Sequence, residues 1–85
     1  MDKRYYIETL DNNVSKAVKT IYRGKSYVTI NKIHKIIERE WIKTEFAKEF
    51  PITPKKIGGS LRRLGAAAYR SRRGYGYQFD NVDNL

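Results

Sequence analysis

The stretch "ITPKKIGGSLRRLGAAAYRSRRGYGYQFD", Ile52 to Asp80, combines a regular apolar pattern with charge of a single sign. Its apolar residues Ile57, Leu61 and Leu64 recur at the spacing of a helix with one buried face. Its cations are Lys55, Lys56, Arg62, Arg63, Arg70, Arg72 and Arg73, and Asp80 is its only acid. An ordered scaffold therefore carries the concentrated positive charge.

The first part of this stretch predicts a helix with well-marked ends over residues 53–65. Thr53 suits the N-cap, and Pro54 suits the first helical position because its missing N–H costs nothing there. Gly65 follows the last turn, where a C-terminal cap is expected. The boundaries of this helix can therefore be read directly from the sequence.

The predicted helix has two faces of opposite character. At 100° per residue, the apolar trio named above faces the core. Lys55, Gly59 and Arg62 point away from the core, and Lys56 and Arg63 lie along one shoulder. Gly58 and Gly59 each cost roughly 1 kcal/mol relative to alanine inside a helix. Close approach to a phosphate backbone or to the preceding helix is expected to explain them.

After Gly65 the apolar period changes from that of a helix to that of a strand. Tyr69 and Ser71 share one face of a first run, and the aromatic row Tyr75, Tyr77 and Phe79 shares one face of a second. Residues 66–80 are therefore predicted to form a β-hairpin with "SRRG" at its turn. We expect the aromatic row to pack on the helical core, because its use as a base-stacking platform would require it to be exposed.

Two further helices and a short strand are predicted before this segment. The first helix covers "TLDNNVSKAVKTIYRGK", and its apolar phase runs back to Tyr6, so residues 1–10 are either its start or an N-terminal extension. "SYVTI" predicts a short strand. The second helix, "NKIHKIIEREW", places Ile33, Ile36, Ile37 and Trp41 on one face. Beyond it the helix either rotates its buried face or breaks near Lys43 and Thr44.

This order of elements resembles winged helix-turn-helix domains over about residues 10–80. The segment "TPKKIGGSLRRLGAAAYRSRRGYGYQF" is similar to a recognition helix followed directly by a wing. The resemblance implies one α+β domain over residues 1–85, with three helices, a short strand and a C-terminal hairpin. It implies a recognition helix at 53–65 and a wing at 66–80. "IKTEFAKEF" departs from the family, which usually has a short turn between the second and third helices.

The resemblance also implies which residues contact DNA. The recognition helix would enter the major groove, and the wing would touch the adjacent backbone or minor groove. An arginine in the major groove can fork onto guanine, and lysines near the helix start can reach phosphates. The candidate residues are Lys55, Lys56, Gly59, Ser60, Arg62 and Arg63 on the recognition helix, and Arg70, Arg72 and Arg73 on the wing.

Composition narrows the remaining classes. The net charge of +9 is concentrated in the last third of the chain, which favours a nucleic-acid partner over a solubilising surface or an anionic membrane. The sequence has no cysteine and no phosphate-binding loop, and its single histidine, His34, has no partner at usable spacing. The glutamates after His34 interleave with lysines and arginines, as on a solvated helix face. We therefore expect no enzyme, metal, cofactor or small-molecule ligand. The sequence has neither a membrane-length apolar run nor a secretion signal, so we expect an intracellular protein, cytoplasmic or nucleoid-associated.

The predicted function is binding of double-stranded DNA as a transcription regulator. An RNA-binding ribonucleoprotein component stays open as an alternative. So does the DNA-binding tail of a replication protein, because the segment also resembles the winged-helix tails of some helicase-primases. A protein-docking winged helix would instead have an apolar outer face on its third helix. The continuous apolar phase from Tyr6 to Ile21 further predicts a homodimer through the first helix.

Overall fold

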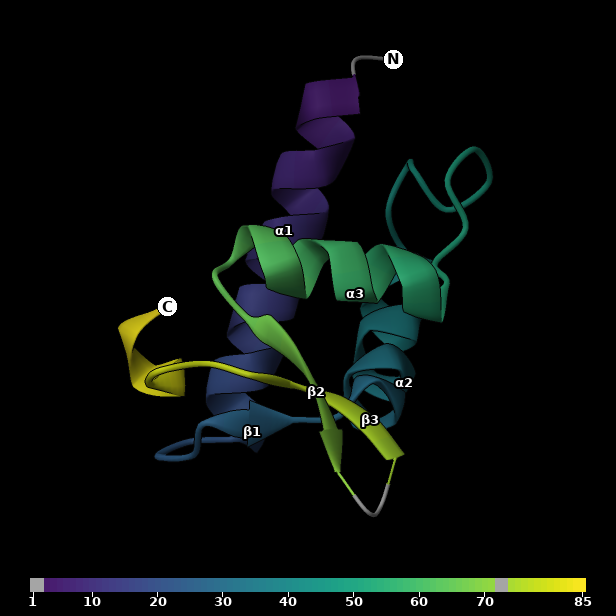
Figure 1. Cartoon of the computed structure of the whole chain (residues 1–85). Coiled ribbons are helices and arrows are strands. Elements are labelled where there is room, and N and C mark those ends of the chain that lie inside the picture. The colour runs from purple at the N-terminus through teal and green to yellow at the C-terminus, as the bar shows by residue number, and fades with distance from the viewer. Residues whose placement is uncertain (1–2, 72–73) are drawn as a thin grey trace.

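The computed structural model describes residues 3–71 and 74–85, which form three helices and a three-stranded antiparallel sheet (Figure 1). The helices are α1 (Lys3–Ile21), α2 (Ile30–Trp41) and α3 (Pro54–Arg63). The strands are β1 (Tyr27–Val28), β2 (Ala67–Ser71) and β3 (Gly74–Gln78), and a short 3-10 helix η1 (Val82–Asn84) follows. The predicted α+β class and the order of the elements are confirmed.

The three helices share one core. Its fully buried side chains include Leu10, Val14 and Val18 of α1, Ile33, Ile37 and Trp41 of α2, and Ile57 and Leu61 of α3. Ile36, predicted on the same face of α2 as Ile33, Ile37 and Trp41, is not buried with them: its side chain is 43% exposed at the edge of that face. Ile36 immediately precedes Ile37, so its side chain is turned by about 100° from that of its buried neighbour.

Helix α1 is continuous from Lys3, so the described part of the first ten residues is the start of the first helix. Helix α2 ends at Trp41 and does not rotate its face. The segment that follows returns to α1: the Phe50 ring stacks on Tyr6 at 4.4 Å between centroids, and the Trp41 indole N–H donates to the Phe50 carbonyl at 2.7 Å. The early turns of α1 and the inserted segment 42–53 therefore bury each other's aromatic residues.

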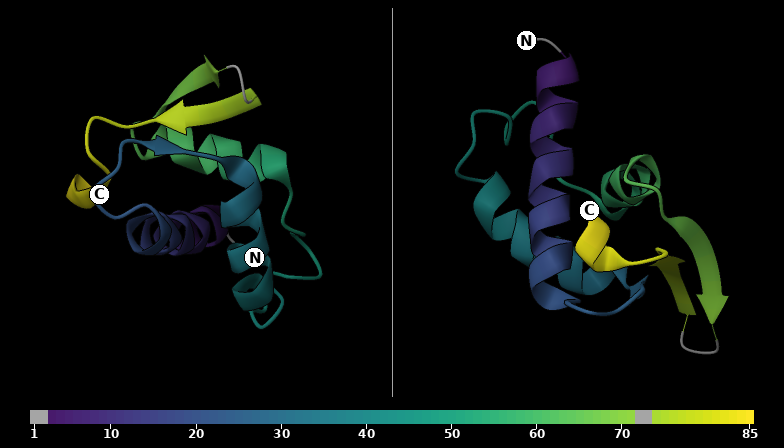
Figure 2. Two further views of the ribbon diagram at one scale, coloured as in Figure 1. Left: turned by 90° about the horizontal axis from the view of Figure 1, so that it is seen from below. Right: turned by 90° about the vertical axis from the view of Figure 1, so that its left-hand side faces the viewer.

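The sheet has the strand order β1-β3-β2, and its hairpin projects from the helical body (Figure 2). Phe79, just past β3, is buried, and Tyr77 is half-buried against the core, so the prediction for these two aromatic residues is confirmed. The side chain of Tyr75 lies outside the described residues. Tyr69 pairs with Gly76 and is 47% exposed on the opposite face, where its ring meets Tyr27 edge-on.

The ends of α3 agree with the prediction. The Thr53 side chain accepts a hydrogen bond from the backbone N–H of Lys56, and Pro54 is the first helical residue. Gly65 has a φ of +106°, a left-handed conformation that residues with a Cβ rarely adopt. Residues at or next to its two ends therefore determine where α3 begins and where it ends.

The adjacent glycines of α3 have different surroundings. Gly58 is buried, and a Cβ on it would lie 2.5 Å from the Tyr77 hydroxyl and 3.7 Å from Ile30 Cδ1. Gly59 is half-exposed, and a Cβ there would meet only the Arg63 Nη1 atom, at 3.6 Å. The hairpin and α2 therefore explain Gly58, whereas no such contact within the described chain explains Gly59.

This contrast predicts opposite effects for two neighbouring substitutions. Gly59→Ala should stabilise the protein by roughly 0.5–1 kcal/mol, because alanine loses less backbone entropy in a helix and meets no obstacle. Gly58→Ala should destabilise it by about 1–2 kcal/mol, because Tyr77 must move. Urea unfolding followed by circular dichroism measures both. Equal effects of the two substitutions would contradict the packing of Tyr77 on α3.

Candidate nucleic-acid interface

The outward face of α3 is open and basic. Lys55 and Arg62 are exposed, and Gly59 between them is half-exposed. On the opposite side of the helix, Ile57 and Leu61 are fully buried in the core. These positions agree with the predicted faces of this helix. The α3 sequence contains no acidic residue, so nothing on the helix itself offsets this charge.

The shoulder of α3 faces the rest of the chain. Lys56, predicted to contact DNA, is half-buried. Its ammonium group donates to the Pro51 carbonyl at 2.8 Å and lies 5.9 Å from the centre of the Tyr6 ring. The charge of Lys56 is therefore held by the inserted segment and α1, off the outward face.

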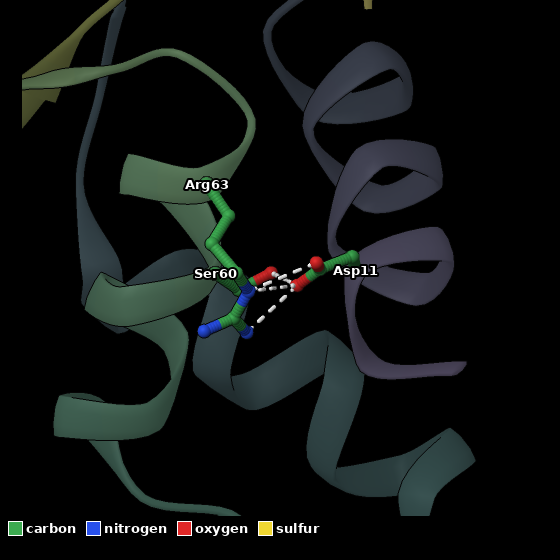
Figure 3. A network of polar contacts seen from close by, with 3 residues as sticks. All are labelled: Asp11, Ser60 and Arg63. Carbon is green, nitrogen blue, oxygen red and sulfur yellow. Dashed lines mark hydrogen bonds and ion pairs between the residues drawn. The ribbon is translucent and has the colours of Figure 1, made fainter. Parts of the chain in front are cut away.

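A polar network joins the middle of α1 to the last turns of α3 (Figure 3). Asp11 Oδ1 accepts from the Ser60 hydroxyl at 2.5 Å and from Arg63 Nη2 at 2.9 Å, and Asp11 Oδ2 accepts from Arg63 Nε at 3.0 Å. The hydrogen bond to Asp11 raises the pKa of the Arg63 guanidinium above its usual value. The network fixes α3 against α1 through directional, charge-assisted bonds.

Ser60, predicted to contact DNA, faces α1 and does not lie on the outward side of α3. Its side chain is fully buried, because its hydroxyl points at α1 and binds the Asp11 carboxylate. Arg63, also predicted to contact DNA, pairs with the same carboxylate but keeps its side chain 42% exposed. The sequence analysis did not predict a role for Asp11. The one available signal was "DNN", because aspartate and asparagine are poor helix formers and are unexpected inside an apolar helical pattern.

The hairpin contributes one described candidate. Arg70 lies on β2 opposite Tyr75 of β3 and is exposed. Arg72 and Arg73, the other two predicted wing contacts, lie outside the described residues. The described part of the hairpin therefore adds cationic surface that follows α3 directly in the chain.

A separate apolar groove of about 190 Å³ runs between α1 and α2. Ala17, Ile21, Ile36 and Ile37 line it, and Lys16 and Glu40 flank it. The rest of the α1 stripe, Tyr6 included, lies in the chain's own core, so the length of the apolar phase does not by itself require a second chain. The homodimer through α1 stays a prediction, and this groove is the apolar surface near α1 that it could use.

Comparison of the chain with protein-family models, with curated proteins and with solved structures finds no match in any of the three.

Among residues 3–71 and 74–85, no helix has the length and apolar character needed to cross a membrane. In the same residues, no three histidine, cysteine, aspartate or glutamate side chains gather as metal ligands would. His34 Nδ1 lies 3.8 Å from Glu38 Oε2, one turn further along α2. The candidate nucleic-acid interface is therefore supported by the positions of the cations on α3 and on the hairpin.

The buried hydroxyl of Ser60 gives a direct test of the network. Ser60→Ala should lower the free energy of unfolding by roughly 1–2 kcal/mol, because a hydrogen bond to a charged group is lost in a buried position. Ser15→Ala, one turn after Asp11 on α1, makes the same chemical change at a half-buried hydroxyl that is not part of the Asp11–Ser60–Arg63 network, and it controls for the higher helix propensity of alanine. Equal unfolding free energies for the two variants would show that the bond adds no stability.

Proposed function

We propose that this chain is a winged-helix protein that binds double-stranded DNA, with α3 in the major groove and the β2–β3 hairpin on the neighbouring backbone or minor groove. The outward face of α3 carries the proposal. Lys55, Gly59 and Arg62 form an open face, to which α3 contributes no acid, directly opposite the buried Ile57 and Leu61. An α-helix fits the major groove, and the groove edges of the bases offer acceptors to such cations.

The arrangement around α3 supports this proposal over a diffuse basic surface. The three helices and the three-stranded sheet follow the order of a winged helix, and the hairpin projects beyond the helices (Figure 2). Arg70 lies on this hairpin, and the sequence adds Arg72 and Arg73. A helix and a hairpin of the same charge, joined by a few residues, suit a major groove and its adjacent backbone. Such a protein would act as a transcription regulator in the cytoplasm or on the nucleoid.

The two exposed cations of α3 should differ in what they contact. Arg62, in the second half of the helix, is proposed to read a guanine edge, so Arg62→Ala should cost roughly 1–3 kcal/mol on the preferred site and much less on random duplex. Lys55, near the start of the helix, is proposed to contact phosphate. Lys55→Gln should weaken all duplexes alike and reduce the slope of log affinity against log salt by about 0.9.

The experiment first selects a preferred site from random duplexes, and then titrates both variants with selected and scrambled duplexes over a range of salt. Circular dichroism checks that each variant is folded. An equal loss from Arg62→Ala on both duplexes would contradict base reading by α3. Displacement of the duplex by structured RNA at equal ionic strength would favour the ribonucleoprotein alternative.

A further inference from the structure

Asp11 occupies only one edge of the Arg63 guanidinium. The bidentate bonds run from Arg63 Nε to Asp11 Oδ2 and from Arg63 Nη2 to Asp11 Oδ1 (Figure 3). A guanidinium carries five N–H donors in a rigid plane, and this side-on pairing uses the Nε–H and one N–H of Nη2. The end of the group, formed by Nη1 and the second N–H of Nη2, still carries donors that can fork onto a pair of oxygens.

That end of the guanidinium lies beside Gly59. Arg63 Nη1 is 3.6 Å from the position that a Cβ on Gly59 would take. Gly59 belongs to the open outward face, next to the exposed cations Lys55 and Arg62. A residue without a side chain lets a ligand approach the helix backbone closely. The donors of Arg63 and the space over Gly59 therefore adjoin each other at the edge of the proposed interface.

We infer that Asp11 holds Arg63 as a preformed fork for a DNA phosphate, and that Gly59 is the opening through which the phosphate reaches it. This inference rests on the proposed function. Phosphate fits better than a base edge, because Arg63 lies on the shoulder of α3, about 100° around the helix from Arg62. A guanidinium that is already fixed loses little side-chain entropy when it binds. Asp11 acts here as a positioning residue.

The sign of one substitution separates this role from simple charge. Asp11→Asn raises the net charge from +9 to +10, so electrostatics alone would make it bind a polyanion more tightly. We expect the reverse, roughly threefold to tenfold weaker binding, because Arg63 loses the ion pair and the second bond of its fork, and one neutral hydrogen bond no longer fixes its plane. Asparagine keeps an oxygen that can accept from the buried Ser60 hydroxyl, so the fold should survive. Glu8→Gln, an equal change of charge at an exposed position of α1, is the matched control.

Two further variants test the fork and its opening. Arg63→Lys keeps the charge but removes the planar fork, and it should weaken binding by a similar factor even if Asp11→Asn is poorly folded. Gly59→Ala should stabilise the helix and yet weaken binding severalfold, because its methyl group fills the space over the fork. A residue that matters only for folding would not combine those two effects.

The measurement is fluorescence anisotropy with a labelled random-sequence duplex and with the selected duplex, at matched salt, with a thermal melt of each variant. The expected result is a similar loss on both duplexes for Asp11→Asn, Arg63→Lys and Gly59→Ala. Asp11→Asn binding as tightly as Glu8→Gln would overturn the inference, and a loss confined to the selected duplex would replace phosphate by a base edge. If the unmodified protein itself shows no salt-dependent binding, the proposed function fails. If it binds, Arg62→Ala loses selectivity and Asp11→Asn binds as tightly as Glu8→Gln, the proposed function stands and only the role of Asp11 is overturned.

Discussion

The Asp11 carboxylate in the middle of α1 fixes the rotation of α3 about its own axis, and so decides which side of α3 faces outward. Burial of Ile57 and Leu61 attracts α3 to the core, but apolar burial is not directional and tolerates small rotations. The bonds from Asp11 to Ser60 and Arg63 have defined lengths and angles, and they join residues 49 and 52 positions apart in the chain. Aspartate is a poor residue inside a helix, so its place in α1 makes sense as the anchor of this network. The outward face of α3 takes its orientation from that anchor.

The inserted segment between α2 and α3 is held by an aromatic cluster that it forms with the first turns of α1 and the end of α2. Trp41 is the last residue of α2, and its ring stacks on Phe46 with 5.8 Å between centroids. Its indole N–H donates a hydrogen bond to the Phe50 carbonyl, which ties the two ends of this segment together. Tyr6, one and a half turns before Asp11, covers the same aromatic rings. The long α1 and the long connection thus compensate for each other: the extra turns supply a surface for the insert, and the insert buries an apolar stripe that would otherwise be exposed.

Local signals in the sequence determine most of the elements, but not how the helices meet. The cap at Thr53, the turn at Gly65 and the alternation around Tyr77 each depend on a few neighbouring residues, so they could be predicted. The faces of α3 followed from its period. The burial of Ser60 and the pairing of Arg63 could not be predicted, because the period shows that a shoulder exists and not which helix it meets. That information belongs to contacts between residues about fifty positions apart.

The same contacts reduce the positive charge that α3 presents on its outward face. The sequence suggests a uniformly cationic segment, yet Lys56 binds a backbone carbonyl and Arg63 shares its charge with Asp11. The charges that remain fully on the outward face are those of Lys55 and Arg62, on either side of a glycine. Fields from a few exposed charges are screened within about 8–10 Å at physiological salt. An anionic partner therefore gains most from these cations when its own charges lie within that distance of α3, and a groove that encloses the helix would bring more charge that close than a flat anionic surface would.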